Sequence, residues 1–217
     1  MDTIMTSREV IDAIKLAEEF YSIQGEGQLT GTPMYFIRFS GCSVGQCPVR
    51  MHCDTDYSYK YRGFADAVAL RAKEQVGNVG WICITGGEPL DQPKALNSLI
   101  KELKDNRVMI QTSGAKALQV EYFMIKGGYL VVSPKTSPKE CKITRASELK
   151  LVYTGQHIEE IREWERTVYA NNVFLMPEWK NGKCNAEDTV AMVKKLQSGN
   201  GRDWKLCMQM HKFADVR

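Results

Sequence analysis

The stretch Trp81–Gln111, WICITGGEPLDQPKALNSLIKELKDNRVMIQ, contains the unit that decides the fold. Trp81–Thr85 is an apolar run typical of a buried strand, Pro93–Lys104 has helical spacing, and Val108–Gln111 is a second apolar run. A strand, a helix and a strand in this order are typical of a βα unit with parallel strands. The same alternation continues on both sides of this stretch.

The elements outside this unit follow the same pattern. Further strands are predicted at Met34–Phe39, Tyr129–Val132, Leu149–Tyr153, Asn172–Leu175 and Trp204–Met208, with helices at Phe64–Val76, Val120–Ile125, His157–Tyr169 and Ala186–Leu196. Arg8–Phe20 is compatible with either a helix or a strand. We therefore predict an α/β fold with a mostly parallel sheet, a single domain over residues 1–217. Because a closed βα barrel typically needs ~250 residues, we expect a partial barrel, with its active site at the carboxyl ends of the strands.

The composition excludes several classes of protein. Of 217 residues, 43% are hydrophobic and 25% charged, which is typical of a globular domain rather than a disordered or fibrous chain. A net charge of +3 does not indicate nucleic-acid binding but is compatible with an anionic small molecule. No apolar run approaches the ~20 residues of a membrane helix, and the first twenty residues lack a signal-peptide core. We expect a cytoplasmic protein with reduced cysteines.

Three cysteines, Cys42, Cys47 and Cys53, follow the Met34–Phe39 strand in the loop GCSVGQCPVRMHCDTD. Thiolates are soft ligands for zinc or for iron–sulfur clusters. Three thiolates on a four-iron cluster leave one iron open to a further ligand, whereas structural zinc needs four ligands. Three ordinary thiols, or a zinc site completed by His52 or a remote cysteine, are the alternatives. The other four cysteines have no predicted functional role.

Five short motifs accompany this loop. They are QGEG at Gln24–Gly27, CDT at Cys53–Thr55, TGGEP at Thr85–Pro89, SPK at Ser133–Lys135 and QMHK at Gln209–Lys212. Together and in this order they resemble the 7-carboxy-7-deazaguanine synthase family of the radical S-adenosylmethionine superfamily. The chain departs from the pattern in its C-x4-C-x5-C spacing, where most of the superfamily has C-x3-C-x2-C, and in Gln111, where the family often has a glutamate.

The resemblance implies three cofactors: a [4Fe–4S] cluster on Cys42, Cys47 and Cys53, S-adenosylmethionine, and Mg²⁺ on the hydroxyl of Thr55. It also implies a set of S-adenosylmethionine contacts, in which Glu88 would accept hydrogen bonds from the cosubstrate ammonium. The full set is His52, Gly86, Gly87, Glu88, Ser113, Ser133, Lys135, Met176 and Pro177.

The implied enzyme is a radical carbon–nitrogen lyase. It contracts the ring of 6-carboxy-5,6,7,8-tetrahydropterin to 7-carboxy-7-deazaguanine with loss of ammonia, in 7-deazapurine (queuosine-type) biosynthesis. The implied substrate contacts are Ile23, Gln24, Gly25, Glu26, Arg38, Thr85, His211 and Arg217. Among them, Gln24 and Glu26 suit an amino-pyrimidinone edge, Arg38 suits the substrate carboxylate, and Arg217 would contribute its terminal carboxylate.

The expected partners are the pterin, a flavodoxin-like electron donor and a second copy of the chain in a homodimer, with no nucleic acid or membrane. Two other functions stay open. One is a radical activase of a glycyl-radical enzyme, which would not need the QGEG and QMHK motifs. The other is a zinc-binding structural module, which metal analysis would separate from an iron–sulfur protein.

Overall fold

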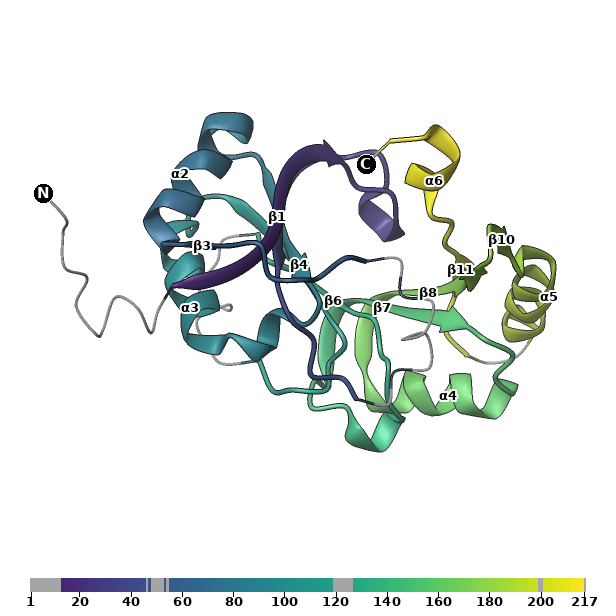
Figure 1. Cartoon of the computed structure of the whole chain (residues 1–217). Helices are drawn as coiled ribbons and strands as arrows, with labels where there is room; N and C mark the ends of the chain where they lie inside the picture. Colours follow the sequence, from purple (N-terminus) through teal and green to yellow (C-terminus); the bar gives the residue numbers. More distant parts are fainter. Residues whose placement is uncertain are drawn as a thin grey trace, which may run out of the picture.

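The computed structural model describes residues 13–45, 47, 53, 55–118, 127–198 and 201–216. Its centre is a nine-stranded sheet with the order β11-β8-β7-β6-β5-β4-β2-β1-β3 (Figure 1). The strands are β1 (Ile14–Ile23), β2 (Pro33–Phe39), β3 (Tyr61–Gly63), β4 (Trp81–Gly86), β5 (Arg107–Thr112), β6 (Tyr129–Val132), β7 (Arg145–Tyr153), β8 (Tyr169–Pro177) and β11 (Trp204–Leu206). A separate hairpin joins β9 (Trp179–Lys180) to β10 (Lys183–Cys184).

The sheet is parallel from β2 to β11, and only β1 and β3 are added antiparallel at one edge. Within the described residues, β11 and β3 pair with one strand each and not with each other. The sheet is therefore open, which confirms the predicted α/β partial barrel.

Helices connect the parallel strands and cover one face of the sheet (Figure 1). They are α2 (Ala65–Val76), α3 (Pro93–Glu102), α4 (Ile158–Thr167) and α5 (Ala186–Gln197), whereas the short α6 (Met210–Ala214) follows β11 near the C-terminus and lies outside this layer. The main core forms between them and alternate strand residues, such as Ile37, Ile84 and Ile110. None of the helices in the described ranges is long and apolar enough to cross a bilayer.

The opposite face of the sheet carries the residues between these core positions. Because successive side chains of a strand point to opposite faces, Phe36, Cys83 and Met109 form a second, smaller cluster there. Polar and charged residues in phase with them, among them Arg38 and Gln111, also lie on this face. A parallel sheet buried on both sides would carry mainly apolar residues, so these polar side chains mark the face that holds a site.

The structure corrects some boundaries of the predicted elements. The ambiguous Arg8–Phe20 stretch contributes to strand β1, because Ile14–Ile23 pairs with both β2 and β3. Strand β8 begins at Tyr169, inside the helix predicted for His157–Tyr169, because Tyr169 N–H donates to Thr144 O at 2.8 Å. The other described helices and strands of the prediction are confirmed with small differences at their ends. The helix predicted for Val120–Ile125 lies outside the described residues.

Candidate active site

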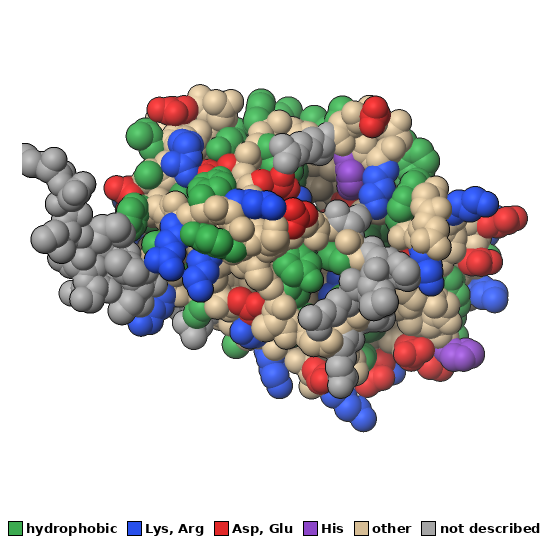
Figure 2. All heavy atoms as spheres, in the orientation of Figure 1, with side chains coloured by type: hydrophobic (Ala, Val, Ile, Leu, Met, Phe, Trp, Pro, Cys, Tyr) green, Lys and Arg blue, Asp and Glu red, His purple; other side chains and the backbone are tan. Residues whose placement is uncertain are grey.

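A cavity of about 600 Å³ lies on the second face of the sheet, at the carboxyl ends of the parallel strands. Figure 2 shows acidic and basic side chains gathered around a hollow between β1 and α6. The predicted site residues that line the cavity are Ile23, Gln24, Gly25, Glu26, Arg38, Cys42, Cys47, Cys53, Thr55, Thr85, Gly86, Gly87, Ser113, Ser133, Lys135, Met176, Pro177 and His211. Glu88 is not part of the lining, and His52 and Arg217 lie outside the described residues.

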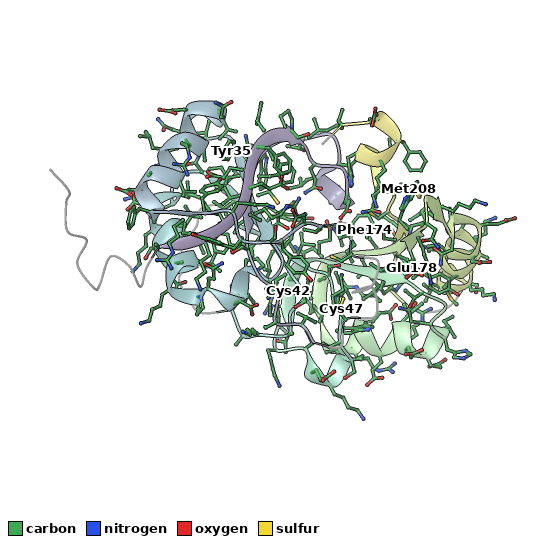
Figure 3. All side chains as sticks on the ribbon, in the orientation of Figure 1. Tyr35, Cys42, Cys47, Phe174, Glu178 and Met208 are labelled. Atoms are coloured by element: carbon green, nitrogen blue, oxygen red, sulfur yellow. The ribbon has the colours of Figure 1, made fainter. Side chains whose placement is uncertain are left out.

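All three cysteines of the loop face this cavity. Cys42 and Cys47, both labelled in Figure 3, are half-buried, whereas Cys53 is exposed. Burial raises the pKa of the Cys42 thiol. Within the described residues no three His, Cys, Asp or Glu side chains are close enough to share one metal ion. Three thiol donors in the lining of one cavity are a soft donor set of the kind that iron–sulfur clusters take.

The turn after β4 is joined to the chain just before Cys42. Gly87 N–H donates to Phe39 O at 3.1 Å, and Glu88 N–H donates to Gly41 O at 3.0 Å. A Cβ atom on Gly87 would lie 2.0 Å from Gly41 O, and one on Gly86 would lie 2.3 Å from Phe39 O. The two glycines therefore allow the protein's own backbone to approach closely, and they fix where the cysteine loop begins.

Glu88 occupies a different position from the one expected. It is fully buried behind the cavity wall, where its carboxylate accepts hydrogen bonds from Leu90 N–H at 3.0 Å and Thr112 Oγ1 at 2.7 Å. It also accepts from Ser113, through the backbone N–H at 2.9 Å and through the hydroxyl. Both carboxylate oxygens are thus bound by the chain. Glu88 thus holds Ser113 in the wall, and its contact with the cosubstrate ammonium stays a prediction.

The Gln24–Gly27 segment lies between strand β7 and the C-terminal segment. Gly25 O accepts a hydrogen bond from Met210 N–H at 2.9 Å, and Gly27 N–H donates to Cys207 Sγ at 3.0 Å. The ring of His211 packs on Gly25, since a Cβ atom on that glycine would lie 2.2 Å from His211 Nδ1. Residues nearly two hundred positions apart thus form one wall.

Glu26 is held by Lys150, which belongs to none of the motifs, and by Gln209, the first residue of the QMHK motif. Its carboxylate forms an ion pair with Lys150 and accepts a hydrogen bond from Gln209 Nε2 at 2.8 Å. Burial raises the pKa of Glu26, but the Lys150 ammonium and these hydrogen bonds outweigh burial and lower the pKa to about 2. The sequence could have indicated Lys150, because a lysine inside the apolar strand LKLVY is as unusual as the arginine at position 38 in its own apolar strand.

Two further cations line the cavity in defined positions. Arg38 Nε donates to Glu18 Oε1 at 2.6 Å, so an acidic partner already holds the guanidinium expected to bind the substrate carboxylate. Lys135 Nζ donates to the backbone oxygen and the hydroxyl of Ser133, at 3.0 and 2.8 Å. Burial and the nearby Lys150 ammonium lower the pKa of Lys135.

Comparison with known proteins gives a consistent result. No family model matches the chain. It is 31% identical over 209 residues to the 7-carboxy-7-deazaguanine synthase of Haemophilus influenzae, with 93% of each chain covered. It is 33% identical over 208 residues to that of Bacteroides thetaiotaomicron, with 94% of this chain and 98% of the relative covered.

A solved structure shares the fold. The crystal structure of QueE from Escherichia coli superposes with a TM-score of 0.65 and 21% sequence identity, covering 95% of this chain and 99% of the other. The identity to the curated relatives extends over nearly the full length of both partners. The chain therefore belongs to the 7-carboxy-7-deazaguanine synthase family.

Proposed function

We propose that this enzyme converts 6-carboxy-5,6,7,8-tetrahydropterin to 7-carboxy-7-deazaguanine with loss of ammonia. One observation carries the proposal: the three cysteines of the loop and the Gln24–Gly27 segment line the same cavity. The cysteines are ligands suited to a radical-generating cofactor, and the Gln24–Gly27 segment has hydrogen-bonding groups suited to a heterocycle. The two sets thus lie in one cavity. A protein-directed activase or a zinc module would need the first set without the second.

The cysteine side of the cavity has a donor set that fits a [4Fe–4S] cluster on Cys42, Cys47 and Cys53. When bound, the cluster and S-adenosylmethionine supply the radical chemistry that starts the ring contraction. The residues proposed to hold S-adenosylmethionine are Gly86, Gly87, Glu88, Ser113, Ser133, Lys135, Met176 and Pro177, with His52 from outside the described residues. In this role Ser113 is oriented by Glu88, and Lys135 by Ser133.

The other side of the cavity supplies the groups that would orient the pterin. The ionised carboxylate of Glu26 is an acceptor for the N–H groups of an amino-pyrimidinone edge, and Gln24 lies two residues before it. Arg38, with Thr85 and Thr55 nearby in the lining, suits the substrate carboxylate. The chain's contribution is to hold the ring in one orientation and to exclude water from a reactive intermediate.

Three finer assignments complete the proposal. Mg²⁺ would bind the hydroxyl of Thr55 and the substrate carboxylate, because hard cations prefer oxygen ligands. The electron would come from a flavodoxin-like protein, and the enzyme would act in the cytoplasm as a homodimer. Family membership supports these assignments.

Anaerobic reconstitution with iron and sulfide, followed by an assay with the pterin, S-adenosylmethionine and a reductant, tests the proposal. We expect about four iron and four sulfide per chain and formation of the deazapurine. An iron-containing protein that cleaves S-adenosylmethionine but leaves the pterin unchanged would contradict the substrate assignment. A colourless zinc protein would contradict the cofactor assignment.

A further inference from the structure

Lys150 is a buried cation whose donors are only partly used by the chain. It lies on β7 with 3% of its side chain exposed, and it lines the cavity. Within the described residues, the carboxylate of Glu26 is the only acceptor at hydrogen-bond distance from Lys150 Nζ. Since an ammonium group has three donor hydrogens, two remain for a group inside the cavity.

The surrounding charges keep this ammonium protonated. Burial alone would lower the pKa of Lys150, but the carboxylates of Glu26 and Glu148 raise it above its ordinary value. Glu148 is itself tied to the neighbouring backbone and ring, accepting from Gln28 N–H at 3.0 Å and from Tyr129 Oη at 3.1 Å. Lys150 therefore acts as a donor only, and a cavity ligand beside it must present an acceptor.

Glu26 and Lys150 form a fixed pair of opposite hydrogen-bonding character. One oxygen of Glu26 accepts from Lys150 and the other from Gln209, so the carboxylate is held from two sides. The pair presents an acceptor and a donor next to each other. An amino-pyrimidinone edge is the complement, because its ring N–H and amino donors lie beside a carbonyl oxygen.

We propose that Lys150 determines substrate specificity by donating a hydrogen bond to the carbonyl oxygen of the pterin's pyrimidinone ring, while Glu26 accepts from the adjacent N–H groups. The inference rests on the proposed function, since it assumes that Glu26 contacts this edge. It adds a substrate contact from β7, and it predicts which related rings the enzyme would reject. A pteridine with an amino group in place of the carbonyl would direct N–H donors at the ammonium, leaving both buried donors without an acceptor.

The test compares two unreactive ligands that differ at this edge of the ring. They are 6-carboxypterin, which has the carbonyl and the adjacent ring N–H, and its 2,4-diamino counterpart, which has an amino group and an unprotonated ring nitrogen there. Each is titrated by fluorescence into the reconstituted enzyme with S-adenosylmethionine, at a pH where both rings are neutral. We expect the parent enzyme to prefer the carbonyl compound roughly ten- to hundredfold, as for a hydrogen bond to a charged group.

The variants separate recognition from structural support. Lys150→Met should weaken binding of 6-carboxypterin and lower the affinity ratio, whereas Lys150→Arg keeps a donor-only cation and should keep the preference. If Lys150 only supported Glu26, Lys150→Met would leave the ratio unchanged in the Glu26→Gln background, which would overturn the proposal. An unchanged iron content and an unchanged thermal unfolding transition show that the variants fold.

Two further results keep the outcome unambiguous. The parent enzyme alone tests the inference even if Lys150→Met does not fold, because equal affinity for the two ligands would refute it. Glu26→Gln tests the underlying assumption, since both ligands carry the 2-amino group and both should bind more weakly. No effect of Glu26→Gln would refute the proposed edge contact, whereas a loss of binding together with a ratio that Lys150→Met leaves unchanged in this background would refute only the role of Lys150.

Discussion

At the scale of single residues, the cysteines of this chain have two different environments. Cys42, Cys47 and Cys53 face the cavity, whereas Cys83 and Cys207 are buried. Burial raises the pKa of Cys83 to about 12 and that of Cys207 to about 11. Burial also raises the pKa of Cys42, so the difference lies in position: of these five cysteines, Cys42, Cys47 and Cys53 line the cavity and are placed to bind a metal cluster.

The buried thiols should therefore resist alkylation in the folded protein. In the cluster-free enzyme at neutral pH, we expect iodoacetamide to modify Cys53 first and to leave Cys83 and Cys207 unmodified until the chain unfolds. Peptide mapping by mass spectrometry measures the order of modification. Labelling of Cys83 at the same rate as Cys53 would show that the described burial is wrong.

Each cysteine of the loop should be needed for the cluster. We expect Cys42→Ser, Cys47→Ser and Cys53→Ser each to lose most of the iron and sulfide and all turnover, because a hydroxyl replaces a soft thiolate poorly. Cys184→Ser, on the β9–β10 hairpin, is the matched control and should retain both. A normal four-iron cluster in Cys47→Ser would refute the ligand assignment for the irregular spacing.

Thr55 offers a test of the magnesium site. If its hydroxyl is a ligand, Mg²⁺ should stimulate turnover of the parent enzyme, and Thr55→Ala should reduce that stimulation severalfold because one oxygen ligand is lost. Turnover measured against Mg²⁺ concentration gives the dependence, and Thr55→Ser, which keeps the hydroxyl, should behave like the parent. Equal stimulation in Thr55→Ala and the parent would exclude the role.

At the scale of elements, the junction between β2 and β4 positions the cofactor side of the cavity. Backbone hydrogen bonds from Gly87 to Phe39 and from Glu88 to Gly41 join the ends of these parallel strands immediately before Cys42. The buried Glu88 then connects this junction to the end of β5 through Thr112 and Ser113. Three strand ends are thus fixed relative to one another.

Gly87→Ala should disturb this junction. Its added Cβ would lie 2.0 Å from Gly41 O, a backbone atom, so the strand ends must separate. We expect a loss of about 1–3 kcal/mol in the free energy of unfolding and poorer cluster retention, measured by thermal unfolding and iron content. Gly45→Ala is the control, because none of the described atoms lies within 4 Å of the Cβ that it would add. Equal stability of the two variants would contradict the close approach.

At the scale of the whole molecule, the sheet is open, and the C-terminal segment forms part of the wall of the site. This segment leaves the sheet at β11, one edge of the sheet, and reaches the end of β1 near the other edge (Figure 1). There Gln209 contacts Glu26, and Met210 contacts Gly25. Phe213 packs edge-on against Trp179 of the β9–β10 hairpin, with ring centres 5.8 Å apart, so the tail is also held from the side.

A short extension after Arg217 should weaken pterin binding. Val216 lines the cavity, and the family resemblance implies that the carboxylate of the next residue, Arg217, contacts the substrate. We expect KM for the pterin to rise severalfold, with cluster content and S-adenosylmethionine cleavage retained, because no side chain is changed. Amidation of the native terminus, which removes only its charge, should have a similar effect. An unchanged KM and kcat in the extended enzyme would reject this contact.

The sequence by itself determined the alternation of strands and helices, the parallel sheet and the two motif sets that face the cavity. These features are local: the period of apolar residues and the spacing of cysteines and glycines can be recognised within one segment. The sequence also indicated Arg38, because a charge within an apolar strand is unusual. The same criterion applied to β7 would have found Lys150.

Only the tertiary structure decided which of these residues meet. Glu26 pairs with Lys150, 124 positions away, and Glu88 holds Ser113 rather than lining the cavity. Gly86 and Gly87, expected to admit a cosubstrate, are required by the backbone before Cys42. Such contacts depend on strand order and register, which bring distant residues to one edge of the sheet. Strand order and register cannot be predicted from local patterns. A buried polar group forms its hydrogen bonds with whichever residue the folded chain brings next to it.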